Sequence, residues 1–241
     1  MGPPDLAAAF IPASGETLLG GLYQASAERP RPAALLLHGL PGHEKNLDLA
    51  IDLRERGVHA LYFHYRGSWG SSGTFSIAGL LADASAALAY LADRPEVDPR
   101  RLAVIGFSLG GWAALALAAS EPRVAACVAV APLVDPRDVP LPADLADESA
   151  ATLAGTSAAR LRDEWISLPA ALSFAEGLRR VPLLLVTADH DELFPPAHYR
   201  DLPANLPQMS WVRFPRARHL FGGVRPGLRH TITDWLSQRL D

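Results

Sequence analysis

Ser108 is the residue of this sequence that most plainly suggests chemistry. It stands in "GFSLG" (residues 106–110), which matches the pattern G-x-S-x-G, and it carries the only polar side chain between Leu102 and Ala119. A serine hydroxyl becomes an effective nucleophile when a neighbouring base removes its proton. The pattern therefore predicts a nucleophile only if the surrounding elements expose Ser108 and bring a base to it.

The apolar run of residues 102–119 allows two interpretations. Its length suits a membrane span. However, glycines cluster around Ser108, the residues before it ("LAVI") are partly β-branched, and those after it ("WAALALAA") are strong helix formers. We therefore predict a buried strand, a sharp turn and a helix, with the Ser108 hydroxyl above the sheet and the helix N-terminus directed at it. A serine that merely caps a core helix is the structural alternative.

The rest of the chain predicts a parallel sheet with helices on both faces. Short continuous apolar runs, typical of strands covered on both faces, occupy residues 33–38, 58–65, 101–107, 124–131 and 181–188. They alternate with helical patterns at 46–57, at 76–94 with Ser76 as the cap and Pro95 after the end, and at 224–241. Residues 8–25 resemble an antiparallel hairpin. We expect one domain over residues 1–241, with residues 136–180 as a cap insertion or a longer crossover.

A base and an acid can be sought at the carboxyl ends of the strands. Of the eight histidines, His219 follows the last predicted strand (210–214), and position alone does not exclude His64. The strand at 181–188 is followed by "DHDELFPP", which offers Asp189, Asp191 and Glu192 as the carboxylate that would orient the imidazole. All three could equally form a solvated acidic turn.

Two backbone amides could bind an oxyanion. One belongs to Leu109, directly after the serine, and the other to Leu40 in "HGLPG" (residues 38–42). Pro41 has no N–H group to donate, so Leu40 is the donor of that loop. Taken alone, "HGLPG" is equally well explained as a tight turn.

Together these motifs resemble the α/β-hydrolase superfamily. The resemblance rests on "HGLPG", "YRGSWGSSG" (65–73), "GFSLG", "ADHDELFPP" (188–196) and "RARHLF" (216–221), in the family's order Ser, Asp, His. It covers residues 10–240 except 136–180. It implies the α/β-hydrolase fold, a Ser108–His219–Asp191 triad, and no metal or organic cofactor. Asp191 is favoured over Asp189 because Ala188, Asp191 and Pro195 fit the family's spacing.

Within the superfamily, the chain is similar to serine esterases and to prolyl-oligopeptidase-like and dienelactone-hydrolase-like proteins. We therefore expect hydrolysis of a small-molecule carboxylic ester, with thioesters as a second acyl class. An aminopeptidase or oligopeptidase shares the triad but needs acidic side chains near the pocket, for which the sequence has no signature. A non-catalytic binding protein on the same fold is a further alternative. We expect Leu161, Trp165 and Phe221 to line the substrate pocket.

The composition limits the partners and the compartment. The net charge of −4, without basic or acidic blocks, argues against nucleic-acid and membrane partners, and it does not indicate an oligomeric state. Cys127 is the only cysteine and the sequence starts without a secretory signal, so we expect a cytoplasmic location.

Overall fold

The computed structural model describes residues 5–26 and 29–240. The N-terminus, predicted to lack a secretory signal, includes residues 1–4, and the predicted domain ends at Asp241; these residues lie outside the described ranges. Eight strands form one sheet in the order β1-β2-β4-β3-β5-β6-β7-β8. Their bounds are β1 Asp5–Ala13, β2 Glu16–Gln24, β3 Arg31–Leu37, β4 His59–Phe63, β5 Val97–Phe107, β6 Val124–Val130, β7 Leu183–Ala188 and β8 Ser210–Phe214.

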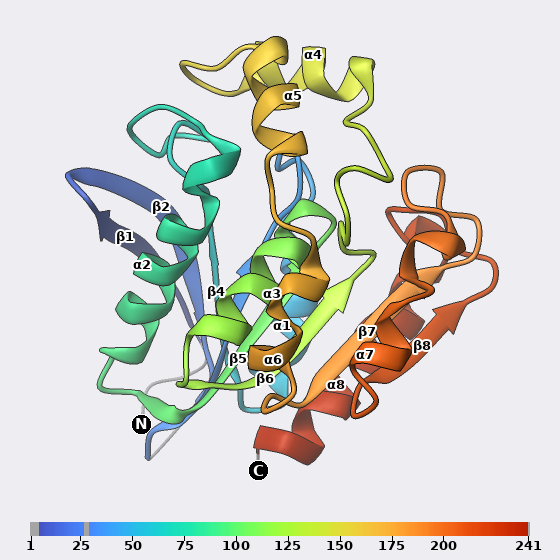
Figure 1. Ribbon diagram of the computed structural model, residues 1–241. Coiled ribbons are helices and arrows are strands. Elements are labelled where there is room, and N and C mark those ends of the chain that lie inside the picture. The colour runs from blue at the N-terminus through green and yellow to red at the C-terminus, as the bar shows by residue number, and fades with distance from the viewer. Residues whose placement is uncertain (1–4, 27–28, 241) are drawn as a thin grey trace.

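The sheet is mainly parallel, as predicted. From β4 across to β8 every neighbouring pair is parallel, whereas β1 pairs antiparallel with β2, and β2 pairs antiparallel with β4. The N-terminal hairpin therefore extends one edge of the parallel sheet. The carboxyl ends of the parallel strands lie together toward the top of Figure 1.

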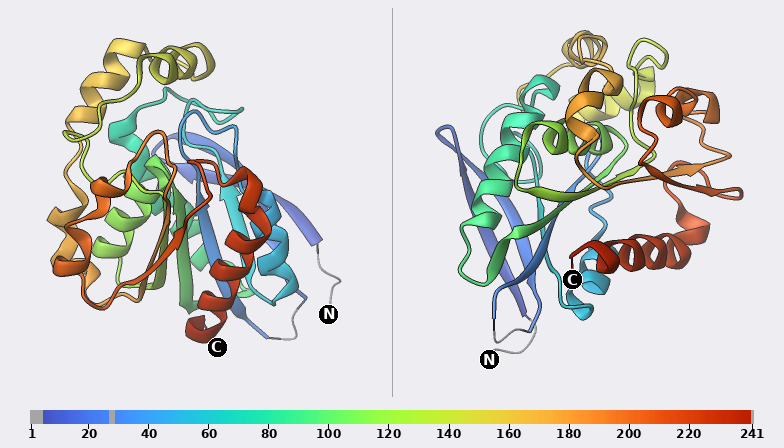
Figure 2. Two further views of the ribbon diagram at one scale, coloured as in Figure 1. Left: turned by 90° about the vertical axis from the view of Figure 1, so that its right-hand side faces the viewer. Right: turned by 60° about the horizontal axis from the view of Figure 1, so that its bottom comes forward.

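Helices cover both faces of the sheet, because its central strands are apolar on both sides. In β3, Leu35 and Leu37 belong to one core, which also holds residues of α2 and α3, while Leu36 belongs to the other, which holds residues of α1 and α8. The second view of Figure 2 shows α8 and α1 on one side of the sheet and α2 and α3 on the other. The helices are α1 Leu47–Glu55, α2 Leu80–Ala92, α3 Leu109–Ser120, α4 Ala143–Thr152, α5 Ala158–Ile166, α6 Ala175–Leu178, α7 Leu202–Asn205 and α8 Arg225–Leu240, with short 3₁₀ helices at Ile77–Gly79, Ala171–Phe174, Pro196–Tyr199 and Gly222–Val224.

The apolar run around Ser108 folds as a strand followed by a helix. Helix α3 is only 12 residues long, and the side chains from Leu109 to Ala118 are all buried. Between layers of the fold, a helix can be apolar around its whole circumference. Among the described residues, no helix combines the length and the apolar character that crossing a bilayer requires.

The structure corrects the predicted role of Ser76. Its side chain makes no capping bond to the helix that follows it. Instead its hydroxyl donates to Glu164 of α5, and the same carboxylate accepts the backbone N–H of Ile77 at 2.6 Å. The pKa of Glu164 is lowered. Burial opposes the charge of the carboxylate, but hydrogen bonds from Arg160, from Ser76 and from the backbone amides of Ile77 and Ala78 outweigh that effect. A distant residue thus supplies the cap, which no local pattern reveals.

The connection at residues 136–180 has two parts. Helices α4 and α5 lie above the ends of the strands in Figure 1. The later part, with α6, packs on α3, where Gly177 lies so close that a Cβ atom there would be 2.3 Å from the carbonyl oxygen of Ala119. Only the α4–α5 segment (residues 143–166) therefore lies over the edge of the sheet where the sequence places its candidate site.

Candidate active site

Ser108 occupies a strained turn between β5 and α3. Its backbone angles, φ 56° and ψ −121°, are ones that non-glycine residues rarely adopt. Glycine flanks the turn because the chains are closely packed: a Cβ atom at Gly106 would lie 2.0 Å from the Gly110 carbonyl oxygen, and one at Gly110 would lie 2.2 Å from that of Leu37. The turn therefore depends on the glycines of the "GFSLG" motif, and it exposes Ser108 at the carboxyl end of the strand.

His219 and Asp191 form a buried pair. His219 Nδ1 lies 2.9 Å from Asp191 Oδ2 and 3.1 Å from Oδ1. Asp191 Oδ1 also accepts the backbone N–H groups of Leu193 and Phe194 at 2.9 and 2.8 Å. The two amides hold the carboxylate in place, and its other oxygen faces the imidazole. With Nδ1–H donating to Asp191, the other ring nitrogen of His219 is unprotonated and can act as a base.

The other two acids of this turn have different partners. Asp189 accepts a hydrogen bond from Arg213 Nε at 3.0 Å. Glu192 accepts the backbone N–H of His219 at 3.2 Å and pairs with Arg218. Its pKa is lowered: burial acts against the charge, and the bond from the His219 backbone is the largest opposing effect. Glu192 thus fixes the loop that carries His219, whereas Asp191 contacts the ring.

His64, which sequence position left open, lies apart from this pair. It is buried, its ring contacts those of His38 and Tyr62, and it does not line the cavity at Ser108. Burial lowers its pKa to about 3, with the charges of His38 and Lys45 adding to the effect. His64 is therefore uncharged near neutral pH and serves as a packed core residue.

The two loops expected to donate amides meet at Ser108. Leu109 is the first residue of α3, so its N–H group belongs to the unpaired first turn of that helix. In the loop after β3, Gly39 lies against the serine: a Cβ atom there would be 2.9 Å from Ser108 Cβ. Leu40, next in the chain, lines the same cavity.

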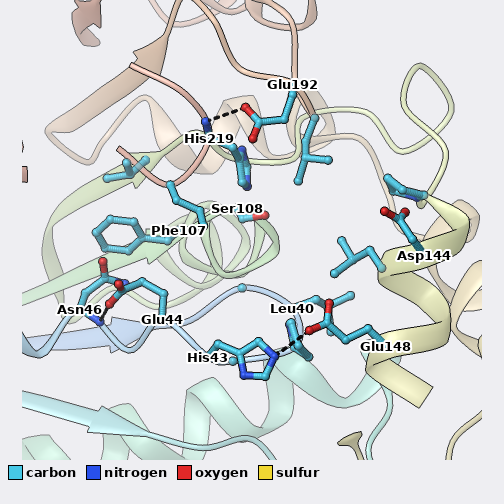
Figure 3. Close-up of a pocket in the computed structure, with 18 of the residues that line it drawn as sticks. Leu40, His43, Glu44, Asn46, Phe107, Ser108, Asp144, Glu148, Glu192 and His219 are labelled. Atoms are coloured by element: carbon cyan, nitrogen blue, oxygen red, sulfur yellow. Dashed lines mark hydrogen bonds and ion pairs between the residues drawn. The ribbon is translucent and has the colours of Figure 1, made fainter. Parts of the chain in front are cut away.

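A cavity of about 490 Å³ opens above Ser108. Ser108, His219 and Leu40 all line it, and Figure 3 shows the His219 ring and the Ser108 side chain at the same cavity. Helix α4 contributes one wall through Asp144, Leu145 and Glu148. Helix α4 therefore bounds the space next to the serine.

None of the three predicted pocket residues lines this cavity, which corrects that expectation. Leu161 is fully buried in the core, and Trp165 donates its indole N–H to the Val139 carbonyl at 2.8 Å and stacks on Phe194. Phe221 packs edge-on against Phe214 on the other face of the sheet. These apolar residues fix the α4–α5 segment and the His219 loop to the fold, and neighbouring residues such as Leu145 and Leu220 line the cavity instead.

The cavity carries four carboxylates. The sequence named Glu192 only as a possible orienting acid, and it did not single out Glu44, Asp144 or Glu148. Of the basic side chains in the lining, Arg225 is paired with Asp48, and His43 Nε2 lies 2.9 Å from a carboxylate oxygen of Glu148. These acids come from three separate segments of the chain, with Asp144 and Glu148 together on α4, so no single local run of charge signals the whole set. The only prior signal was the chemical argument that a peptidase would need acids here.

Comparison with known proteins agrees with this architecture. The sequence pattern of the prolyl oligopeptidase family matches residues 46–241. An uncharacterised protein of Mycobacterium tuberculosis is 36% identical over 134 residues, which cover 52% of this chain and 48% of that protein. A thiohydrolase of Arthrinium phaeospermum is 32% identical over 146 residues, covering 55% and 45%.

A solved esterase of Pyrococcus furiosus has the same fold, with a TM-score of 0.78 and 16% identity over 99% of this chain and 92% of its own. The chain spans about half the length of the curated relatives named above. The family match, in contrast, extends from α1 to the end of the chain and includes Ser108, Asp191 and His219. The chain therefore belongs to the prolyl oligopeptidase family and is an α/β hydrolase.

Proposed function

We propose that this protein is a serine hydrolase that cleaves small carboxylic esters, thioesters included, through a Ser108–His219–Asp191 triad. One observation carries the proposal: a buried carboxylate orients an imidazole at Nδ1, and that imidazole shares a cavity with a serine in a strained strand-to-helix turn. A packed core needs neither the strain at Ser108 nor a buried carboxylate paired with histidine. A serine nucleophile that is presented by the turn and activated by an oriented imidazole gives a reason for both.

In the proposed reaction His219 removes the hydroxyl proton of Ser108 as the serine oxygen attacks the carbonyl carbon. Asp191 accepts the Nδ1–H bond and stabilises the imidazolium that forms. His219 then protonates the leaving alcohol or thiol as the tetrahedral intermediate collapses to the acyl-enzyme. Water, deprotonated by the same imidazole, releases the acid and restores the serine.

The amides of Leu109 and Leu40 are the proposed donors to the oxyanion. The Leu109 amide opens α3, where the helix dipole favours negative charge. The Leu40 amide belongs to the loop that packs on Ser108 through Gly39. Donors held in place before reaction stabilise the charge as it develops and need little reorganisation.

We infer that the α4–α5 segment acts as a cap that limits the size of the acyl or alcohol group. The support is its position over the cavity, where Leu145 supplies an apolar side chain and Asp144 and Glu148 supply charge. A cavity of about 490 Å³ suits a small-molecule substrate. The thiohydrolase among the relatives supports including thioesters in the substrate class.

A peptidase is the second candidate, favoured by two observations. The family whose pattern matches is named for oligopeptidases. The carboxylates of the cavity, of which Asp144 lies on the α4 wall, could bind the amine of a peptide or aminoacyl group. Esters and matched p-nitroanilides of the same acyl groups, measured side by side, separate the two candidates.

The proposed function is tested by Ser108→Ala. This variant should lose at least about 10³-fold in turnover of p-nitrophenyl butyrate and should lose labelling by a fluorophosphonate, with an unchanged circular dichroism spectrum. Ser120→Ala, at the far end of the same helix, is the matched control and should keep both. Retained labelling in Ser108→Ala would refute the nucleophile, and an unreactive wild type would favour a binding protein.

A further inference from the structure

Trp69 contacts the loop that carries Leu40, although it belongs to a different segment, the "YRGSWGSSG" loop after β4. Its indole Nε1–H donates to the Pro41 carbonyl at 2.8 Å. The residue is 37% exposed, so burial of a large apolar surface does not explain its place. The contact needs another reason, and the loop that it reaches supplies one.

The loop at residues 39–45 has little backbone hydrogen bonding. Besides the indole of Trp69, the His38 ring contacts the Gly39 carbonyl at 2.8 Å and Glu148 contacts His43 at 2.9 Å. Within the described residues, no backbone–backbone hydrogen bond involves any residue from 39 to 45. The same loop lies against the nucleophile through Gly39. A small change in its path would therefore move the Leu40 amide relative to Ser108, and the bond from Trp69 opposes such a change.

Trp69 itself is held firmly. Its φ of 49° is left-handed, a conformation that costs free energy for a bulky residue and persists only where its surroundings enforce it. The neighbouring backbone does so. Ser68 N–H donates to the Tyr65 carbonyl at 3.0 Å, and Ser71 N–H donates to the Ser68 carbonyl at 2.9 Å. The Ser71 hydroxyl donates to the backbone carbonyl of His64 at 2.7 Å. The indole therefore projects from a rigid base.

The indole also packs closely on the loop. Gly42 has a φ of 95°, and a Cβ atom there would lie 2.7 Å from both Trp69 Nε1 and His38 Cε1, so only glycine allows these two rings to approach the loop. The His43 ring meets the indole edge-on at 5.2 Å, and Lys45 Nζ lies 4.7 Å from its centre. Contacts at four positions of one short loop make Trp69 a clamp for that loop.

We propose that Trp69 is a positioning residue, whose indole holds residues 39–45, and with them the Leu40 amide, in the orientation that binds the oxyanion. This inference rests on the proposed hydrolase function and adds a residue to it. Trp69 does not line the cavity, so it acts through the loop and not through the substrate. Its loss should weaken binding of the transition state more than binding of the substrate.

The test is Trp69→Phe, which keeps a ring for His43 and Lys45 and removes the N–H donor. We expect kcat for p-nitrophenyl butyrate to fall about 10-fold while KM stays within about twofold. The inhibition constant of a butylboronic acid, which forms a tetrahedral adduct with the serine, should rise by about the same factor as the loss in kcat/KM. Trp235→Phe, which removes an equivalent indole donor on α8, should change neither quantity.

The proposal is overturned if Trp69→Phe behaves like Trp235→Phe, or if kcat/KM falls through KM with boronic acid affinity unchanged. A change in melting temperature without the kinetic split also overturns it, since that would indicate a purely structural role. If the wild type shows neither esterase activity nor labelling by a fluorophosphonate, the proposed function itself is refuted. That result differs from the outcomes above, which all require an active wild type.

Discussion

Replacing Asp191 by asparagine probes the proposed base most directly. Asparagine has nearly the same shape, and its oxygen can still accept the backbone amides of Leu193 and Phe194. Its amide nitrogen then faces His219 Nδ1, where the carboxylate oxygen lies 2.9 Å away in the native protein. Since an amide nitrogen is only a donor, the imidazole must place its proton on the other nitrogen, and it can no longer accept the proton of Ser108.

The loss in kcat at neutral pH should be about 10³- to 10⁴-fold, because the wrong tautomer removes base catalysis and leaves the amide donors in place. Asp189→Asn is the matched control two residues away. It removes an ion pair to Arg213, whose side chain is 55% exposed, so kcat should change less than about twofold and stability by less than about 1 kcal/mol.

The assay is hydrolysis of p-nitrophenyl butyrate, with thermal unfolding followed in parallel. Similar small losses in both variants would place the orienting acid elsewhere. A large loss in Asp191→Asn that merely follows a collapse of the melting temperature would show that the carboxylate serves the fold. Either result would refute the reasoning that selects Asp191.

Two further predictions concern pH and substrate charge. Burial lowers the pKa of His38 from 6.5 to about 4 and that of His64 to about 3. As the pH falls, these histidines are therefore protonated in the unfolded chain before they are protonated in the folded protein. Their contribution to the free energy of unfolding should be complete above about pH 6.5, and each should have lost on the order of 2 kcal/mol of it at pH 5. Urea unfolding at pH 7 and pH 5 checks this, since His64→Phe should lose about 2 kcal/mol less than the wild type, and equal losses would contradict it. The carboxylates of the cavity should favour a cation, so kcat/KM for butyrylcholine should exceed that for the uncharged 3,3-dimethylbutyl ester. Asp144→Asn combined with Glu148→Gln should lower that ratio about 3- to 10-fold, and an unchanged ratio would exclude an effect of these charges.

The local patterns predicted the framework well, because strand and helix periodicity depend on nearby residues. The continuous apolar runs appear as the parallel strands, and the change in composition at Ser108 marks the junction of β5 with α3. The sequence left Asp189, Asp191 and Glu192 as alternatives, and family spacing favoured Asp191. The structure gives the three acids different partners: Arg213 for Asp189, the imidazole for Asp191, and a backbone amide for Glu192.

The lining of the cavity was not predictable in the same way. Leu161 and Trp165 have the spacing of an apolar helix face, and that pattern reports burial without saying what covers the face. The carboxylates of the cavity and the contact of Trp69 with Pro41 join segments far apart in the chain. Such groups meet only when the sheet orders its strands and brings their loops together.

By itself, the sequence determined the fold class and the glycine-flanked turn at Ser108, since both follow from backbone sterics and from which residues exclude water. Only the tertiary structure decided which acid reaches His219, which side chains surround Ser108, and which loop Trp69 holds. These depend on the sheet order, because it pairs β3 with β4 and β7 with β8, so that the loops following each pair lie within hydrogen-bonding distance of each other.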